Sequence, residues 1–237
     1  MTLDSPLARR LADLGFSPHA ALALLALLAA LVPVELGSHG AGGTAAYVGG
    51  LAAAALAVAV VPLTAALADV RLEPVLAGAA CASAAAAAIH FAVIGEHVDE
   101  YWLFGVLFAV TAVGQLAWAV LAVLRPSRLL LVLAMAANLG VIVVWVFSRT
   151  TGLPIGPDAG QPEAVGVADV TATAFEIALV AGALILLAGR HARSPLTPRG
   201  VWLLALPAVA AAAIALAPGG SHGQGDHHAH AAHHAGH

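Results

Sequence analysis

The chain has 237 residues, of which 61% are hydrophobic and only 9% are charged, and its formal net charge is −4 at pH 7. This composition excludes an ordinary soluble domain, because so few polar groups could not cover so much apolar surface in water. It also argues against a nucleic-acid-binding protein, since the sequence has no basic tract. We therefore expect an integral membrane protein whose partner is the lipid bilayer.

Seven apolar segments of about 20 residues follow one another and predict an all-α helical bundle in the membrane. Helices are expected because they satisfy their own backbone hydrogen bonds in hydrocarbon. The predicted spans are residues 18–36, 44–67, 74–95, 101–124, 129–148, 168–189 and 201–217. Residues 1–217 would form this bundle, and residues 218–237 a disordered tail.

The basic residues predict the orientation of the bundle. All nine are arginines, and eight of them fall in alternate gaps between the spans: Arg9, Arg10, Arg71, Arg125, Arg128, Arg190, Arg193 and Arg199. Arg149 alone lies on the opposite side. The positive-inside rule then places the amino terminus inside and the carboxyl terminus outside. Because lysine is absent beside much alanine, glycine and arginine, we expect a GC-rich bacterial gene and the bacterial cytoplasmic (inner) membrane.

The first predicted span could be a retained anchor or a signal sequence. Arginines precede it, as in a signal sequence, but no convincing small-x-small cleavage site follows, which favours an anchor. Glu35 and His39 lie at its outer end, four residues apart, and are candidate polar ligands. Gly37 between them weakens a shared helical face.

The third span carries small residues at close to four-residue spacing: Gly78, Ala82, Ser83 and Ala86. Small side chains at this spacing let helices approach closely in lipid. We therefore expect this span near the centre of the bundle.

Ionisable residues gather at the outer end of the third span, where His90 is followed by His97 and Glu100. On one continuous helix, His90 and His97 would stand about 10 Å apart along the axis, too far to bind one ion. They would converge only if the chain turned near Gly95. His97 and Glu100 are three residues apart and could share a ligand. Alternatively, this acidic segment is only the solvated start of the next helix and binds nothing.

Gln115 and Asn138 lie near the middle of the fourth and fifth spans. Amides at this depth usually form hydrogen bonds between helices. We interpret them as structural residues that join the two spans.

The longest connection between spans, residues 150–168, is rich in glycine and proline. This composition predicts a loop built from turns that lies over the outer mouth of the bundle. The loop could act as a lid or could be a plain connector.

The sixth span carries Asp169, Thr173 and Glu176 on one helical face. Glu176 lies about two turns into the membrane, where an ionisable side chain is costly unless it faces the bundle or a water-filled cavity. It is therefore a functional candidate. Arg149 is expected to orient Glu176 through an ion pair.

The tail holds seven histidines: His222, His227, His228, His230, His233, His234 and His237. Neutral imidazoles at this density can chelate Cu(II), Ni(II) or Zn(II). The alternatives are a purification tag and a segment that gains charge as the pH falls.

Two stretches of the chain form a longer pattern. The first runs from His90-Phe91 to Glu96-His97-x-x-Glu100-Tyr101-Trp102, and the second from Ser148-Arg149-Thr150-Thr151-Gly152-Leu153-Pro154 through Glu163 to Gly166-Val167-Ala168-Asp169. This pattern resembles a group of small polytopic membrane proteins from GC-rich bacteria, over roughly residues 80–190. The resemblance implies a natural multi-span protein and implies no reaction.

The favoured function is the binding of a transition metal, Cu, Zn or Ni, in uptake, sensing or delivery. The tail would capture the ion and present it to an outer-leaflet site of His90, His97, Glu100 and Glu176, with His39 and Glu35 as further candidates. Covalent catalysis has no visible candidate, because the sequence has no Gly-x-Ser-x-Gly, His-Glu-x-x-His or Cys-x-x-Cys motif.

Two other functions fit the same residues. In a membrane oxidoreductase subunit, two of His39, His90 and His97 would ligate a haem between helices. In a non-catalytic scaffold or assembly partner, the outer ion pairs would only set the register of the helices.

Overall fold

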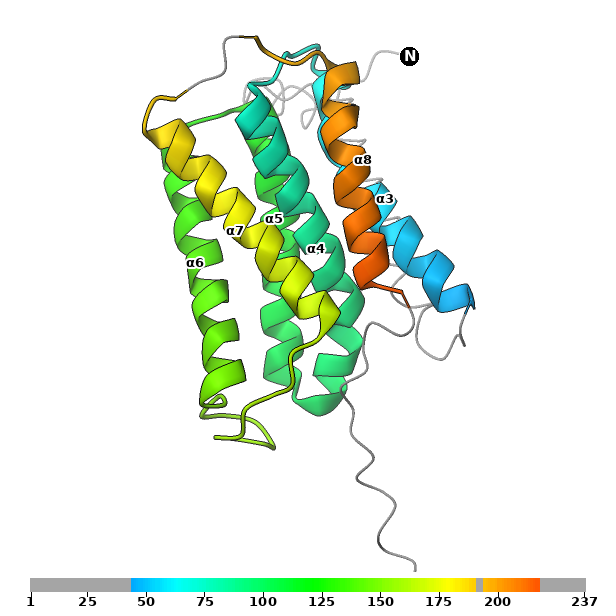
Figure 1. Cartoon of the computed structure of the whole chain (residues 1–237), viewed down its shortest axis with the longest axis vertical. Helices are drawn as coiled ribbons and strands as arrows, with labels where there is room; N and C mark the ends of the chain where they lie inside the picture. Colours follow the sequence, from blue (N-terminus) through cyan, green and yellow to red (C-terminus); the bar gives the residue numbers. More distant parts are fainter. Residues whose placement is uncertain (1–43, 191–193, 218–237) are drawn as a thin grey trace, which may run out of the picture.

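The computed structural model describes residues 44–190 and 194–217, which form an all-helical bundle (Figure 1). The described helices are α3 (Thr44–Leu67), α4 (Pro74–Glu100), α5 (Trp102–Leu124), α6 (Arg128–Thr150), α7 (Val167–Leu187) and α8 (Pro198–Ala215). In the described part, the only β contact is a single bridge between Leu72 and Leu196.

The predicted all-α class is confirmed, and the predicted number of spans is corrected. Five of the described helices, α4 to α8, are long and apolar enough to cross a membrane, and α3 contains a shorter apolar helix, Leu51–Leu67. The structure thus describes six helices where the sequence predicted seven spans. The predicted first span, residues 18–36, lies outside the described residues, as do Glu35, His39 and the tail.

Helix α4 lies at the centre of the bundle, as its small residues predicted. It contacts α3, α5, α7 and α8, and one unbroken run of its residues, from Ala79 to His90, is buried. Small side chains allow the neighbouring helices to approach this closely. At Gly182 of α7, an added Cβ would lie only 3.2 Å from the Cβ of Ala79. Gly182 therefore permits the close packing of α7 on α4.

Helix α6 lies at the edge of the bundle, on the left of Figure 1. It packs mainly against α7 and touches α5 only slightly, although α5 and α6 are consecutive. Ser127 begins α6 as an N-cap, because its side chain accepts a hydrogen bond from the backbone of Leu130. In a membrane, most of the apolar surface of α6 would face lipid.

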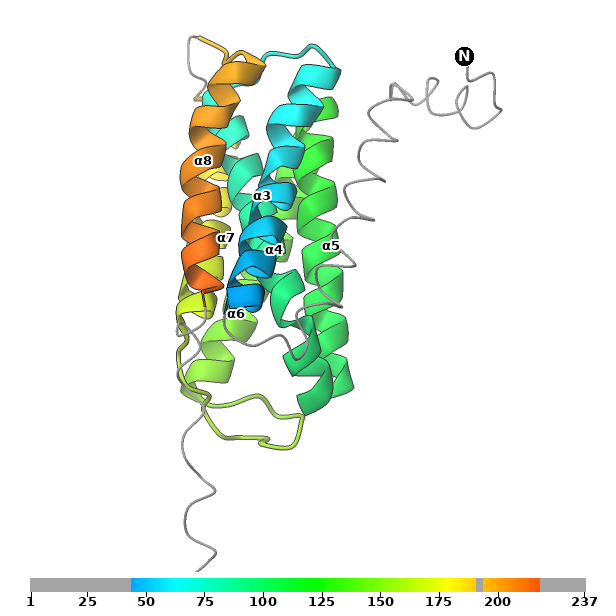
Figure 2. The same ribbon diagram turned by 90° about the vertical axis from the view of Figure 1, so that its right-hand side faces the viewer.

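The connections divide between two ends of the bundle (Figures 1 and 2). The α3–α4, α5–α6 and α7–α8 connections lie at one end, which we call the arginine-rich end. The α4–α5 turn and the loop of residues 151–166 lie at the other, which we call the loop end. The described arginines near the first end are Arg71, Arg125, Arg128, Arg190 and Arg199. Arg149 lies at the loop end. The described arginines that fall in alternate gaps of the sequence therefore lie at one end of the described bundle, and Arg149 lies at the other.

Candidate functional site

A cavity of about 80 Å³ lies between α4, α5, α6 and α7, toward the loop end. Apolar and aromatic side chains form much of its wall, among them Phe104, Leu107, Phe108, Val141 and Val144. A cavity of this size has room for several water molecules, each of which needs roughly 10–15 Å³ on this measure. It combines an apolar wall with a few polar side chains, which is typical of ligand sites.

The deepest polar contact of the cavity joins α4 to α7. His90 Nε2 lies 3.0 Å from Oε1 of Glu176, and the two residues are 5% and 1% exposed. Glu176 thus faces the interior of the bundle, as its depth in the span required. With Glu176 as a carboxylate, which only accepts hydrogen bonds, Nε2 of His90 is the donor in this contact and Nδ1 is the other ring nitrogen.

The same carboxylate also joins a chain of amides. Gln115 Nε2 donates to Glu176 Oε1 and to Asn138 Oδ1, each at 3.1 Å. Asn138 Nδ2 donates in turn to the backbone oxygen of Ala134 at 2.8 Å. Gln115 and Asn138 therefore connect α5 to α6, as predicted from the sequence. Gln115 also extends the network to α7.

His97 lines the cavity one step nearer to the loop end. Its Nδ1 donates to the backbone oxygen of Val93 at 2.8 Å, so the neutral ring leaves Nε2 unprotonated. Phe108 of α5 contacts both imidazoles, with ring centroids 4.0 Å from His97 and 5.4 Å from His90. The two histidines thus share one aromatic neighbour and one cavity.

The two histidines do not converge on one ion, because the turn near Gly95 that this would require is absent from the described helix. Helix α4 continues through Gly95 to Glu100 without a turn, so His90 and His97 stay about 10 Å apart along its axis. Glu100, at the end of the helix, is exposed and does not line the cavity. Within the described ranges, no group of three His, Cys, Asp or Glu side chains is placed to hold a metal ion.

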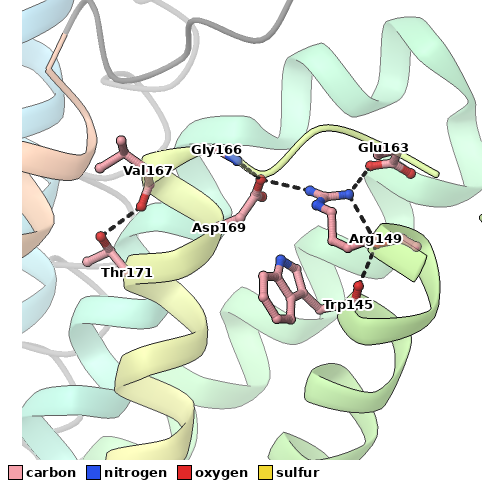
Figure 3. A network of polar contacts seen from close by, with 8 residues as sticks. Trp145, Arg149, Glu163, Gly166, Val167, Asp169 and Thr171 are labelled. Carbon is pink, nitrogen blue, oxygen red and sulfur yellow. Dashed lines mark hydrogen bonds and ion pairs between the residues drawn. The ribbon is translucent and has the colours of Figure 1, made fainter.

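Arg149 forms ion pairs different from the one predicted. Its Nη2 donates to Asp169 Oδ2 at 2.7 Å and its Nη1 to Glu163 (Figure 3). The predicted pair with Glu176 is therefore wrong, since that carboxylate is occupied by His90 and Gln115. The pairing has a local cause, because Asp169 lies at the start of α7, where its side chain also accepts a hydrogen bond from the backbone of Gly166.

The loop of residues 151–166 crosses the end of the bundle beside the cavity. Leu153 and Glu163 of this loop line the cavity, and the backbone N–H of Glu163 donates to the oxygen of Ser148 at 2.9 Å. Gly156 adopts φ +97, and an added Cβ there would lie 2.9 Å from the ring of Phe104. The loop is therefore packed onto α5 and α6 at the mouth.

The cavity wall carries polar atoms that the described residues leave without a partner. These buried atoms are His90 Nδ1, Trp145 Nε1 and Arg149 Nε. Trp145 lies one helical turn before Arg149 on α6, beside the ion pairs (Figure 3). Buried polar groups normally have partners, so unsatisfied atoms at a cavity wall point to water or a ligand.

The charges of the cavity favour a positively charged occupant. Three carboxylates, Glu163, Asp169 and Glu176, line it together with one guanidinium, Arg149. The carboxylates thus outnumber the guanidinium, and two of them, Glu163 and Asp169, are paired with it. Such a balance inside a membrane bundle is costly unless protons or cations compensate it.

Two contributors to this site were not singled out as site residues from the sequence. They are Glu163, in the loop, and Trp145, on α6. The four-residue spacing of Trp145 and Arg149 was the available signal, because it places both side chains on one face of a helix.

Comparisons of the chain with protein-family models, with curated proteins and with solved structures found no match.

Proposed function

We propose that this chain is a multi-pass protein of a bacterial inner membrane that binds a transition-metal ion, copper, zinc or nickel, in the cavity between α4 and α7. The observation that carries the proposal is the contact between Glu176 and Nε2 of His90, together with the unpartnered Nδ1 of the same ring. Metal-binding histidines commonly donate their second ring N–H to a carboxylate or a backbone carbonyl, which orients the ring and raises its basicity.

His97 has the same arrangement with a different acceptor. Val93 O receives its Nδ1–H, and Nε2 is left to bind a ligand. Both imidazoles are thus prepared as nitrogen ligands in a cavity whose net charge favours cations. Because the two rings lie far apart along α4, we propose His90 as the primary ligand, with water completing the coordination. His97 would then serve as a second contact nearer to the mouth.

The tail histidines would supply this site. Helix α8 runs from the arginine-rich end toward the loop end (Figure 1). The described chain therefore ends, at residue 217, toward the end that holds the mouth of the cavity. Imidazoles supplied from that end would capture ions and raise their local concentration. On the predicted orientation, capture would take place outside the membrane, in uptake, sensing or delivery.

The haem alternative is less well supported. His90 and His97 lie on the same face of one helix and cannot ligate opposite sides of a haem between helices. The remaining pairs require His39, which lies outside the described residues.

Elemental analysis of the protein in lipid nanodiscs tests the proposal. The full-length chain with all seven tail histidines replaced by alanine would be dialysed against Zn(II), Cu(II) or Ni(II). We expect about one bound ion per chain for one of these metals. We further expect its loss on His90→Ala and its retention in the control Thr171→Ala, whose hydroxyl donates to the backbone oxygen of Val167 within α7.

If the chain without tail histidines binds none of the three metals, the cavity is not a metal site. Binding that survives His90→Ala would place the ion elsewhere. A protein that binds no metal but loses stability on substitution of the network would be the scaffold considered above.

A further inference from the structure

A groove of about 400 Å³ opens between α5 and α6, on the side of the bundle that would face lipid. Val110, Thr111, Gly114, Gln115 and Trp118 line it from α5, and Leu133, Ala134, Ala137, Asn138 and Val141 from α6. It exists because the two consecutive helices barely touch, while α6 packs on α7. The small residues on both walls leave it wide.

The groove contains a buried polar atom that lacks a partner. The side chain of Gln115 lines the groove, and the residue is only 5% exposed. Among the described residues, no donor reaches its Oε1. The amide cannot satisfy this oxygen by flipping. Its Nε2 already donates to two acceptors, Glu176 Oε1 and Asn138 Oδ1, and a flip would set oxygen against oxygen at both.

From these observations we infer that the groove binds a bilayer-dissolved amphiphile, with an apolar body between α5 and α6 and a hydroxyl group that donates to Oε1 of Gln115. Apolar side chains and Trp118 would contact the body of the ligand. A hydroxyl is the complementary group, because Oε1 is an acceptor and leaving it unmet in a low-dielectric site is costly. Entry would be lateral, from the lipid.

The groove is also connected to the cavity described above. Thr111 and Val141 line both spaces, and Gln115 of the groove donates directly to Glu176 of the cavity. A ligand in the groove would therefore contact the network that orients His90. The inference does not depend on metal binding, since it rests on the groove and on Gln115 alone.

The test uses a hydroxylated probe and the fluorescence of Trp118. The full-length protein in nanodiscs would be titrated with 11-bromo-1-undecanol, whose bromine quenches nearby tryptophan. We expect saturable quenching that is absent from Trp118→Phe. The same chain without the hydroxyl, 1-bromoundecane, should bind about tenfold more weakly, as expected for an unmet buried hydrogen bond.

Two glycines provide a matched pair of variants. An added Cβ at Gly114, in the groove, meets no described atom within 4 Å, and the same holds at Gly140 of α6, which does not line the groove. Gly114→Leu should fill the groove and weaken binding of 11-bromo-1-undecanol at least about tenfold. Gly140→Leu should leave binding of 11-bromo-1-undecanol unchanged. Ala137→Leu blocks the groove from the opposite wall and covers the case in which Gly114→Leu does not fold.

Equal binding of the two probes, or unchanged binding in both blocked variants, would overturn the inference. Quenching that never saturates would do so too, because it would reflect probe dissolved in the surrounding lipid. Metal content serves as an independent readout, since failure of the groove would leave any ion at His90 in place.

Discussion

His90 and Glu176, 86 residues apart in the chain, meet through a 3.0 Å contact in the interior of the bundle. Among the described acidic residues and histidines of α4 and α7, these two are the most deeply buried. The contact ties α4 to α7 at the floor of the cavity, and it therefore serves both the stability of the bundle and the chemistry of the site.

The effects of the two single substitutions in this pair on the free energy of unfolding should not be additive. We expect His90→Ala to lower the free energy of unfolding by about 3 kcal/mol, because Glu176 would stay buried with Gln115 as its remaining donor. Reversible unfolding of His90→Ala, Glu176→Gln and the double variant, with Thr171→Ala as control, would measure the coupling. The double variant should be about 1–3 kcal/mol more stable than the sum of the single effects predicts. Strict additivity would show that the two side chains do not interact.

Arg149→Gln should release the loop of residues 151–166. The substitution removes the cation between Glu163 and Asp169 and leaves two carboxylates close together without it. Amide hydrogen exchange in the loop should become at least about tenfold faster. Arg128→Gln, at the arginine-rich end, is the control and should leave exchange in this loop unchanged. Unaltered exchange in Arg149→Gln would mean that packing on Phe104 and the backbone bond from Glu163 to Ser148 hold the loop without the ion pairs.

Gly182→Leu should separate α7 from α4. The Cβ alone would come within 3.2 Å of Ala79 and 3.5 Å of Val75, and leucine adds three more carbon atoms beyond it. We expect a loss of about 1–3 kcal/mol in unfolding free energy, as for overpacked cores. Gly140→Leu, in open space on α6, should change stability by less than about 0.5 kcal/mol. Equal stability of the two variants would show that α7 can shift without cost.

The orientation of the bundle can be tested with reporter fusions. A reporter fused after residue 126, at the arginine-rich end, should report a cytoplasmic location, and one fused after residue 158, in the loop, an external one. The opposite result would place the cavity mouth on the cytoplasmic side and rule out capture of external ions by the tail.

The helices could be predicted from the sequence because hydropathy is a local property. Each of the last six predicted spans falls on a described helix, from Thr44–Leu67 to Pro198–Ala215. The inward direction of Glu176 could also be predicted, since a charged group at that depth avoids lipid. Both conclusions follow from single segments and their solvent.

The pairing of side chains could not be predicted in the same way. Several carboxylates lie toward the same end of the bundle as Arg149. The sequence does not contain the helix rotations that decide which of them pairs with it. The structure sets those rotations through close packing, such as that of Gly182 on Ala79. Glu176 then meets His90, and Asp169, two turns earlier on α7, meets Arg149.

The position of Phe108 gives both imidazoles a common magnetic environment. Its ring lies against His90 and against His97, so its ring current shifts the carbon-bound proton resonances of both. Any event that rotates this phenyl group, whether at the mouth or at the floor of the cavity, would displace the two sets of signals together. Because of this one aromatic side chain, the proton chemical shifts of the two histidines should change together in a nuclear magnetic resonance spectrum.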